Sequence, residues 1–169
     1  VRKIVRDEFS KKDINKVILD LRGNGGGYVS AAQELLSLWI DGQPILIQRG
    51  KSGKDETIYA NRGGALLANI PTIVLTNGTT ASSSEIVAGA LKDYGKATIV
   101  GETTFGKGVV QTLLNLSGDT LLKVTTARWY TPNGTSINGE GIKPDIEIER
   151  TYEDINKDRD PQLDKALLM

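Results

Sequence analysis

The stretch PTIVLTNGTTASSSEIVAGALKDYGKATIVG, residues 71–101, decides the fold class of this chain. Apolar runs at 71–77 and 97–101 are typical of buried strands. Residues 83–95 between them have the apolar spacing of a helix, which Gly95 would end. Strand and helix alternate here, and this alternation predicts an α/β domain.

The flanking sequence extends the same pattern in both directions. Residues 16–22 predict another buried strand and residues 31–40 another helix. Residues 108–130 predict a hairpin, with strands at 108–117 and 120–130 and a turn at Gly118–Asp119. The remaining expected elements are helices at 1–10 and 161–169, strands at 44–50 and 146–150, and some strand within the polar stretch 56–64. We therefore expect an α/β core, a mixed sheet with flanking helices, over residues 1–150, followed by a polar tail at 151–169.

The charge balance and two missing residue types narrow the chemistry. The 169-residue chain has 21 basic and 21 acidic residues, so we expect no nucleic-acid partner. It contains no cysteine and no histidine, which excludes disulfides, cysteine nucleophiles, a Ser-His-Asp triad and most zinc chemistry. We expect neither a metal nor a cofactor. Covalent catalysis would have to use Ser, Thr, Lys, Tyr or a carboxylate.

Two glycine loops approach nucleotide-binding motifs without matching them. The loop LRGNGGGY, residues 21–28, has Tyr28 where a dinucleotide fingerprint needs its third glycine. Its backbone N–H groups at a helix start would suit a phosphate or a developing oxyanion equally well. The loop GETTFGKG, residues 101–108, has Gly108 where a P-loop needs Ser or Thr, and a β-branched sequence follows where the P-loop needs a helix. A nucleotide-binding α/β protein is therefore the weaker alternative.

A run of hydroxyl side chains, TTASSS at 79–84, lies at a predicted turn from strand to helix. Helix capping explains one of these hydroxyls or two, because Ser82 or Ser83 followed by Glu85 resembles a capping box. A serine at this turn has its oxygen at the N-terminus of the helix, where the dipole favours an alkoxide, as in a nucleophile elbow. One serine is therefore a candidate nucleophile, and spacing alone does not say which.

A serine nucleophile in a chain without histidine needs another general base, and lysine can serve. Burial away from carboxylates favours the neutral amine, which can accept a proton. Lys107 has the driest predicted surroundings, between Phe105 and a pair of valines, although a solvated surface lysine is the ordinary alternative. Gln111 would lie on the same side of a strand as Lys107. Its amide carbonyl could orient the amine without adding a negative charge.

Four segments together resemble the catalytic core of the carboxyl-terminal processing peptidases, also called tail-specific proteases. They are DLRGNGGG, NGTTASSSEIVAGAL, GETTFGKGVVQ and TTARWYTPNGTSINGEGIKPD, in the order and spacing of that family over about residues 16–149. The resemblance implies a ClpP/crotonase-like serine peptidase core in which Ser82 is the nucleophile and Lys107 the general base. It also implies that Gln111 supports the lysine, and that the amides of Ser83 and Gly26 form the oxyanion hole.

The resemblance further implies hydrolysis of polypeptide substrates, near their C-terminal tails, in the periplasm, cell envelope or organelle lumen. The PDZ domain that usually precedes this core is not in the sequence, so we expect an N-terminally truncated core, with a regulatory PDZ domain or adaptor supplied elsewhere. A homo-oligomer is compatible with the sequence. A non-catalytic peptide-binding module on the same fold is the alternative, which the retention of Ser82, Lys107 and Gln111 argues against.

Overall fold

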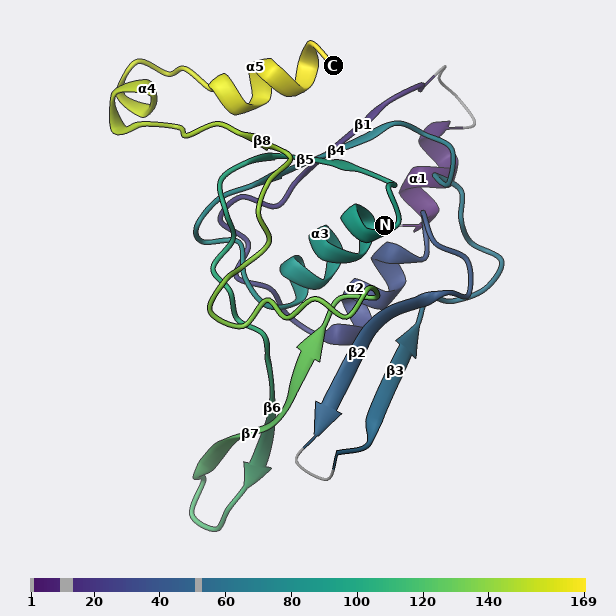
Figure 1. The fold of residues 1–169 in the computed structure, drawn as a ribbon, viewed down its shortest axis with the longest axis vertical. Coiled ribbons are helices and arrows are strands. Elements are labelled where there is room, and N and C mark those ends of the chain that lie inside the picture. The colour runs from purple at the N-terminus through teal and green to yellow at the C-terminus, as the bar shows by residue number, and fades with distance from the viewer. Residues whose placement is uncertain (1, 10–13, 51–52) are drawn as a thin grey trace.

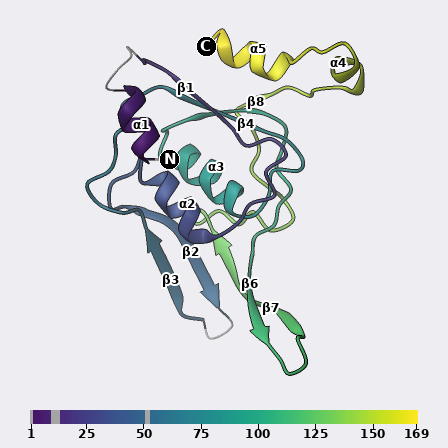
Figure 2. The same cartoon turned by 180° about the vertical axis from the view of Figure 1, so that it is seen from behind.

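The computed structural model describes residues 2–9, 14–50 and 53–169. Val1 and Ser10, the ends of the helix predicted at 1–10, lie outside these residues. Between them the chain forms α1 (Arg2–Phe9). Figure 1 shows the arrangement of the elements, and Figure 2 shows it from behind.

The described residues form two four-stranded sheets. The first contains β1 (Val17–Asp20), β4 (Thr72–Thr76), β5 (Thr98–Gly101) and β8 (Ile146–Glu147) in the order β1-β4-β5-β8, and all its pairs are parallel. The second contains β2 (Pro44–Gly50), β3 (Asp55–Tyr59), β6 (Val109–Asn115) and β7 (Leu121–Tyr130) in the order β3-β2-β7-β6, and all its pairs are antiparallel. The α/β class is confirmed, with the two kinds of pairing in separate sheets and not in one mixed sheet.

Two helices fill the space between the sheets. They are α2 (Val29–Leu36) and α3 (Ser83–Asp93), and α3 is buried along its length from Ser83 to Leu91. The main hydrophobic core joins them to both sheets through large side chains such as Trp39, which also donates from Nε1 to Thr72 Oγ1 at 2.8 Å. Most of the buried residues of α3 are apolar, which explains why the sequence at 83–95 predicts a helix so clearly.

The C-terminal residues cover the other face of the parallel sheet. Here α5 (Pro161–Leu167) buries Ala166 and packs Leu163 against strand side chains that include Leu75 and Val100. In Figures 1 and 2, α5 and α3 lie on opposite sides of this sheet. The 151–169 segment also contains α4 (Tyr152–Asn156), which was not predicted and whose start Thr151 caps.

Other differences between prediction and structure lie at element ends. Helix α2 begins at Val29 and ends at Leu36, so it is shifted from the predicted 31–40. Strand β8 has two residues where 146–150 was predicted, because pairing with β5 reaches only to Glu147. No helix in the described part of the chain is both long and apolar enough to span a bilayer.

The parallel sheet brings three loops together. Since β1, β4 and β5 run in the same direction, the loops after their carboxyl ends meet at one edge of the sheet. Hydrogen bonds tie these loops to one another. Thr80 Oγ1 donates to Leu21 O at 2.8 Å, Ala81 N to Asn24 O at 3.0 Å, and Phe105 N to Thr80 O at 2.9 Å. The glycine loops and the hydroxyl run found in the sequence therefore form one cluster.

Candidate active site

Ser82 occupies a strained turn at the start of α3. Its φ of 58° and ψ of −121° lie in a region that residues with a side chain rarely adopt. Such strain costs about 1–3 kcal/mol and is concentrated at functional sites. Ser82 and Glu85 form the predicted capping box, in which the Glu85 carboxylate accepts from the Ser82 N–H at 2.8 Å. The Ser82 side chain faces the N–H of Glu85 without a side-chain capping hydrogen bond, so its oxygen lies at the positive end of the helix.

Ser82, Lys107 and Gln111 line one cavity of about 280 Å³. The structure thus brings together the three side chains predicted as nucleophile, base and supporting amide. All three are half-buried. In the described part of the chain the Lys107 amine and the Gln111 amide make no hydrogen bond or ion pair, so both are available to a group in the cavity. Because β6 follows Lys107 directly, the helix that a P-loop needs is absent, and the nucleotide-binding alternative fails on this point.

The two predicted oxyanion donors lie beside Ser82 but differ in availability. The N–H of Ser83 is the first of α3 and has no partner within the helix. Gly26 packs so closely on this turn that a Cβ there would be 2.8 Å from Ser83 N and 2.6 Å from Ala81 O. However, the Gly26 N–H donates to Asn24 Oδ1 at 3.0 Å. Gly27, the next residue, lines the cavity with Ser82.

Glu85 connects the turn at Ser82 (the nucleophile loop) to the loop at 101–108 that contains Lys107 (the lysine loop). The sequence did not predict this role. Its side chain is fully buried. One carboxylate oxygen accepts from the backbone N–H of Ser82 at 2.8 Å and of Lys107 at 2.9 Å. The other accepts from Thr104 Oγ1 at 2.5 Å and Gly106 N at 2.6 Å. Sequence alone indicated only a capping residue, because the distant partners depend on how β5 and α3 pack.

Arg22 anchors the base of the glycine loop to the C-terminal segment. Its guanidinium donates to Asp20, to Asp160 at 2.8 Å and to Gln162 Oε1 at 2.9 Å. The Arg22 hydrogen bond holds the pKa of Asp160 below its usual value. Gln162 is buried and also donates from Nε2 to Glu102 Oε1 at 3.3 Å, at the start of the lysine loop. The segment 160–162 therefore braces two of the three loops from outside the cavity.

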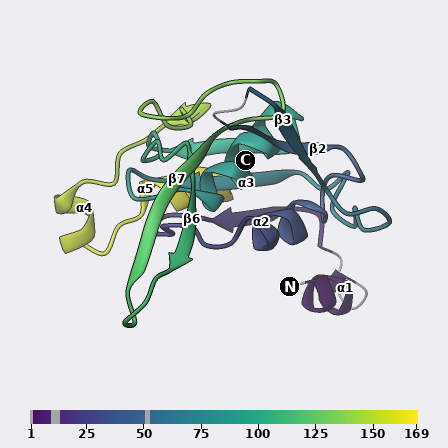
Figure 3. The same cartoon turned by 90° about the horizontal axis from the view of Figure 1, so that it is seen from below.

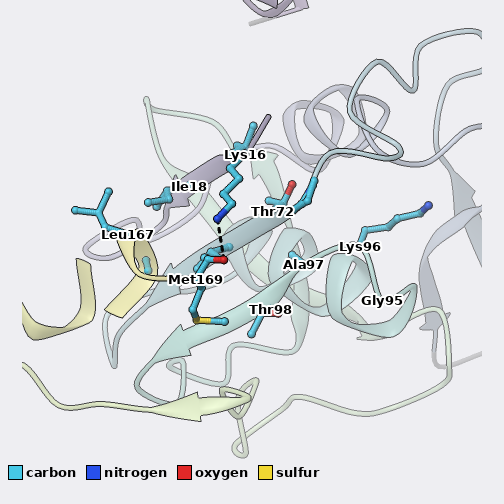
Figure 4. A pocket seen from close by; sticks show the side chains of 13 residues that line it. Lys16, Ile18, Thr72, Gly95, Lys96, Ala97, Thr98, Leu167 and Met169 are labelled. Carbon is cyan, nitrogen blue, oxygen red and sulfur yellow. Dashed lines mark hydrogen bonds between the residues drawn. The ribbon is translucent and has the colours of Figure 1, made fainter. Parts of the chain in front are cut away.

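A larger cavity lies elsewhere in the described residues. It measures about 650 Å³ and lies beside the amino ends of β1, β4 and β5, at the opposite end of the sheet from Ser82. Figure 4 shows its lining, in which Lys16 donates to Met169 O at 2.9 Å. It contains neither a serine nor a lysine of the three loops. The smaller cavity is the candidate active site because it brings together a serine at a strained turn and a lysine.

A serine at a strained turn, in one cavity with a lysine where parallel strands end, is the arrangement expected of a serine hydrolase that uses lysine in place of histidine. Comparison with known proteins gives the family. Peptidase family S41 matches residues 2–148, and the chain belongs to this family.

Several relatives are similar over most of this chain. It is 41% identical over 167 residues to the carboxy-terminal-processing protease of Bartonella bacilliformis, which covers 97% of this chain and 38% of the relative. It is also 41% identical to the chloroplastic C-terminal processing peptidase of Tetradesmus obliquus, over 84% of this chain and 30% of the relative. Among solved structures, the photosystem II D1 C-terminal processing protease has a TM-score of 0.78 and 36% identity, covering 87% of this chain and 38% of that chain. The chain therefore spans between 30% and 38% of these relatives.

Proposed function

We propose that this chain is the catalytic core of a serine endopeptidase that hydrolyses polypeptides near their C-terminal tails through a Ser82 acyl-enzyme. The observation that carries the proposal is the shared cavity of Ser82, Lys107 and Gln111 at a strained helix start. Membership of Peptidase family S41 and the names of its relatives support the reaction class.

Acylation begins when the Ser82 oxygen attacks the carbonyl carbon of the scissile bond. The Lys107 amine takes the serine proton as the new C–O bond forms. The Ser83 N–H and one N–H of the glycine loop donate to the negative oxygen. The second donor is the N–H of Gly27, or that of Gly26 after its hydrogen bond to Asn24 breaks. Each such donor contributes about 3–4 kcal/mol to the transition state. The lysine then gives its proton to the leaving amine as the C–N bond breaks.

Deacylation repeats these steps with water. The Lys107 amine takes a proton from a water molecule while the water oxygen attacks the acyl-enzyme carbonyl. The C–O bond to Ser82 then breaks. The proton returns to the Ser82 oxygen. Gln111 has no other partner among the described residues, so its amide oxygen is free to orient the amine through this exchange.

We also propose that the protein acts outside the cytoplasm, in the periplasm, cell envelope or organelle lumen, because one relative is named chloroplastic.

The test is hydrolysis of an unstructured protein by the wild type and four variants. Ser82→Ala and Lys107→Ala should abolish cleavage, and Lys107→Arg should do so while keeping the charge. Ser83→Ala is the matched control, since it removes a neighbouring hydroxyl but keeps the backbone N–H. Unchanged turnover by Ser82→Ala in chains that remain folded by circular dichroism would contradict the proposal.

A further inference from the structure

The hairpin of β6 and β7 has two faces with different surroundings. Its register pairs Gln111 with Thr125, Leu113 with Lys123 and Asn115 with Leu121. Directly opposed residues in an antiparallel pair point to the same side of the sheet. We call the side of Gln111, Leu113, Asn115, Leu121, Lys123 and Thr125 the cavity face. The other side carries Leu114 opposite Leu122 and is the outer face.

The cavity face continues out of the candidate active site. Gln111 and Lys123 line the same cavity as Ser82 and Lys107. The next apolar side chains along that face, Leu113 and Leu121, are 61% and 60% exposed. Figures 1 and 3 show the hairpin projecting away from the rest of the chain. Contiguous exposed apolar side chains beside a site mark a binding surface, and this strip leads directly to the reacting serine.

The hairpin also offers main-chain hydrogen bonds. Strand β6 is an edge of its sheet, with β7 on one side and no strand on the other among the described residues. An extended peptide can add to such an edge by main-chain pairing while its side chains alternate between the faces. A chain paired there would place alternate side chains on the cavity face.

The charge of the cavity lining favours an acidic group. Apart from Lys107, which the mechanism uses as a base, its lining has Lys123 and no aspartate or glutamate. In the described part of the chain the Lys123 amine has no hydrogen bond or ion pair. Glu85, at the start of α3, is fully buried and its carboxylate contacts Ser82 and residues of the 101–108 loop. Lys123 is therefore a positive charge without a protein partner beside an apolar strip.

We propose that the cavity face binds the segment of the polypeptide substrate that flanks the scissile bond, held extended along β6. Apolar side chains of the substrate pack on Leu113 and Leu121, and an acidic side chain pairs with Lys123. This inference rests on the proposed peptidase function and adds a substrate preference to it: an unfolded segment that combines apolar residues with an acidic one.

The first experiment compares the two faces of the hairpin. The pair Leu113→Ser and Leu121→Ser alters the cavity face, and the pair Leu114→Ser and Leu122→Ser is the matched control on the outer face. Each pair is assayed on an unfolded apolar polypeptide and on a small acyl ester that reaches only the serine. We expect KM for the polypeptide to rise about tenfold in the cavity-face pair, the effect of losing partial burial of two leucines. KM in the outer-face pair and ester hydrolysis in both pairs should change less than twofold.

The outcomes separate the two proposals. Normal ester hydrolysis with equal polypeptide KM in both pairs overturns the hairpin inference and leaves the peptidase function standing. Absence of ester hydrolysis in the wild type overturns both. A cavity-face pair that changes only the sedimentation coefficient, with KM unchanged, shows that the strip holds a second copy of this chain and also overturns the inference.

The second experiment tests the charge. Two peptide series carry Asp or Lys in turn at each of three positions on either side of the scissile bond. The wild type should prefer Asp at one position by about tenfold in kcat/KM, and Lys123→Glu should reverse the preference there and nowhere else. Lys143→Glu, an exposed lysine away from the cavity lining, is the matched control. The same preferences in wild type and Lys123→Glu would refute the assignment of Lys123.

Discussion

Replacing Glu85 with glutamine would uncouple the loop of Ser82 from the loop of Lys107. The buried carboxylate accepts two hydrogen bonds at each oxygen. A glutamine amide has a single acceptor oxygen, so its NH₂ group must face one of the two pairs of donors. The NH₂ group of the glutamine should face Thr104 and Gly106, because the threonine hydroxyl can rotate and accept a hydrogen bond from it. The backbone N–H of Gly106 is then left without an acceptor.

The magnitude follows from these four contacts. A hydrogen bond to a charged group contributes about 1.5–3 kcal/mol, and a buried donor without a partner costs about 1–3 kcal/mol. Losing one such bond and making the others neutral should lower the free energy of unfolding by about 3–5 kcal/mol, which corresponds to about 10 °C in Tm. A shift of about 1 Å between Ser82 and Lys107 should also lower kcat/KM about 100-fold. Glu85→Ala should cost more in both respects.

The assay combines thermal unfolding with peptide hydrolysis well below the lower Tm, so that the variant is folded during catalysis. Glu140→Gln, which removes the same charge from an exposed side chain, is the control. A Glu85→Gln variant with the Tm of the control and with kcat/KM within threefold of it would show that the carboxylate does not couple the loops.

Three further predictions concern the loops and their brace. Gly26→Ala should reduce kcat/KM at least tenfold, since its Cβ would collide with the nucleophile turn, whereas Gly25→Ala, with nothing within 4 Å, should be tolerated. The pKa of Asp160 is lowered by Arg22, so its contribution is complete above the unfolded value of about 3.9 and is lost as pH falls through the lower folded value. Thermal melts should therefore show that the wild type loses more stability below about pH 4 than Asp160→Asn does, and parallel curves would contradict this. Gln162→Leu should lower the free energy of unfolding by about 1–3 kcal/mol, because buried partners lose their hydrogen bonds, and an unchanged denaturation midpoint would count against the brace.

Most of the fold follows from the sequence because the deciding segments are strongly patterned. The strand at 72–76 is buried throughout, and so are residues 99–101 of the next strand and 83–91 of the helix, so their apolar runs are unambiguous. The hairpin turn at Gly118–Asp119 is also as predicted, with both residues at positive φ. The division into two sheets was missed, because pairing partners depend on long-range packing that local pattern does not encode.

The residues of the candidate site were predicted from the sequence, but the hydrogen bonds that connect its loops were not. The sequence placed Ser82, Lys107 and Gln111 together only with the help of the family resemblance, and the structure puts them in one cavity. The contacts of Glu85 and Gln162 span 21 and 60 residues of sequence, and neither residue type is unusual at its position. Such contacts appear only when the loops are assembled in space.

The central claim is that the Ser82 oxygen is the nucleophile and that Lys107 activates it. Labelling with a fluorophosphonate probe, followed by peptide mass spectrometry, measures this most directly. We expect one adduct on Ser82, formed at least 100-fold more slowly in Lys107→Ala, because a general base typically contributes a factor of about 10²–10⁴. An adduct on Ser83 or Ser84, or a labelling rate that does not change when Lys107 is replaced, would contradict it.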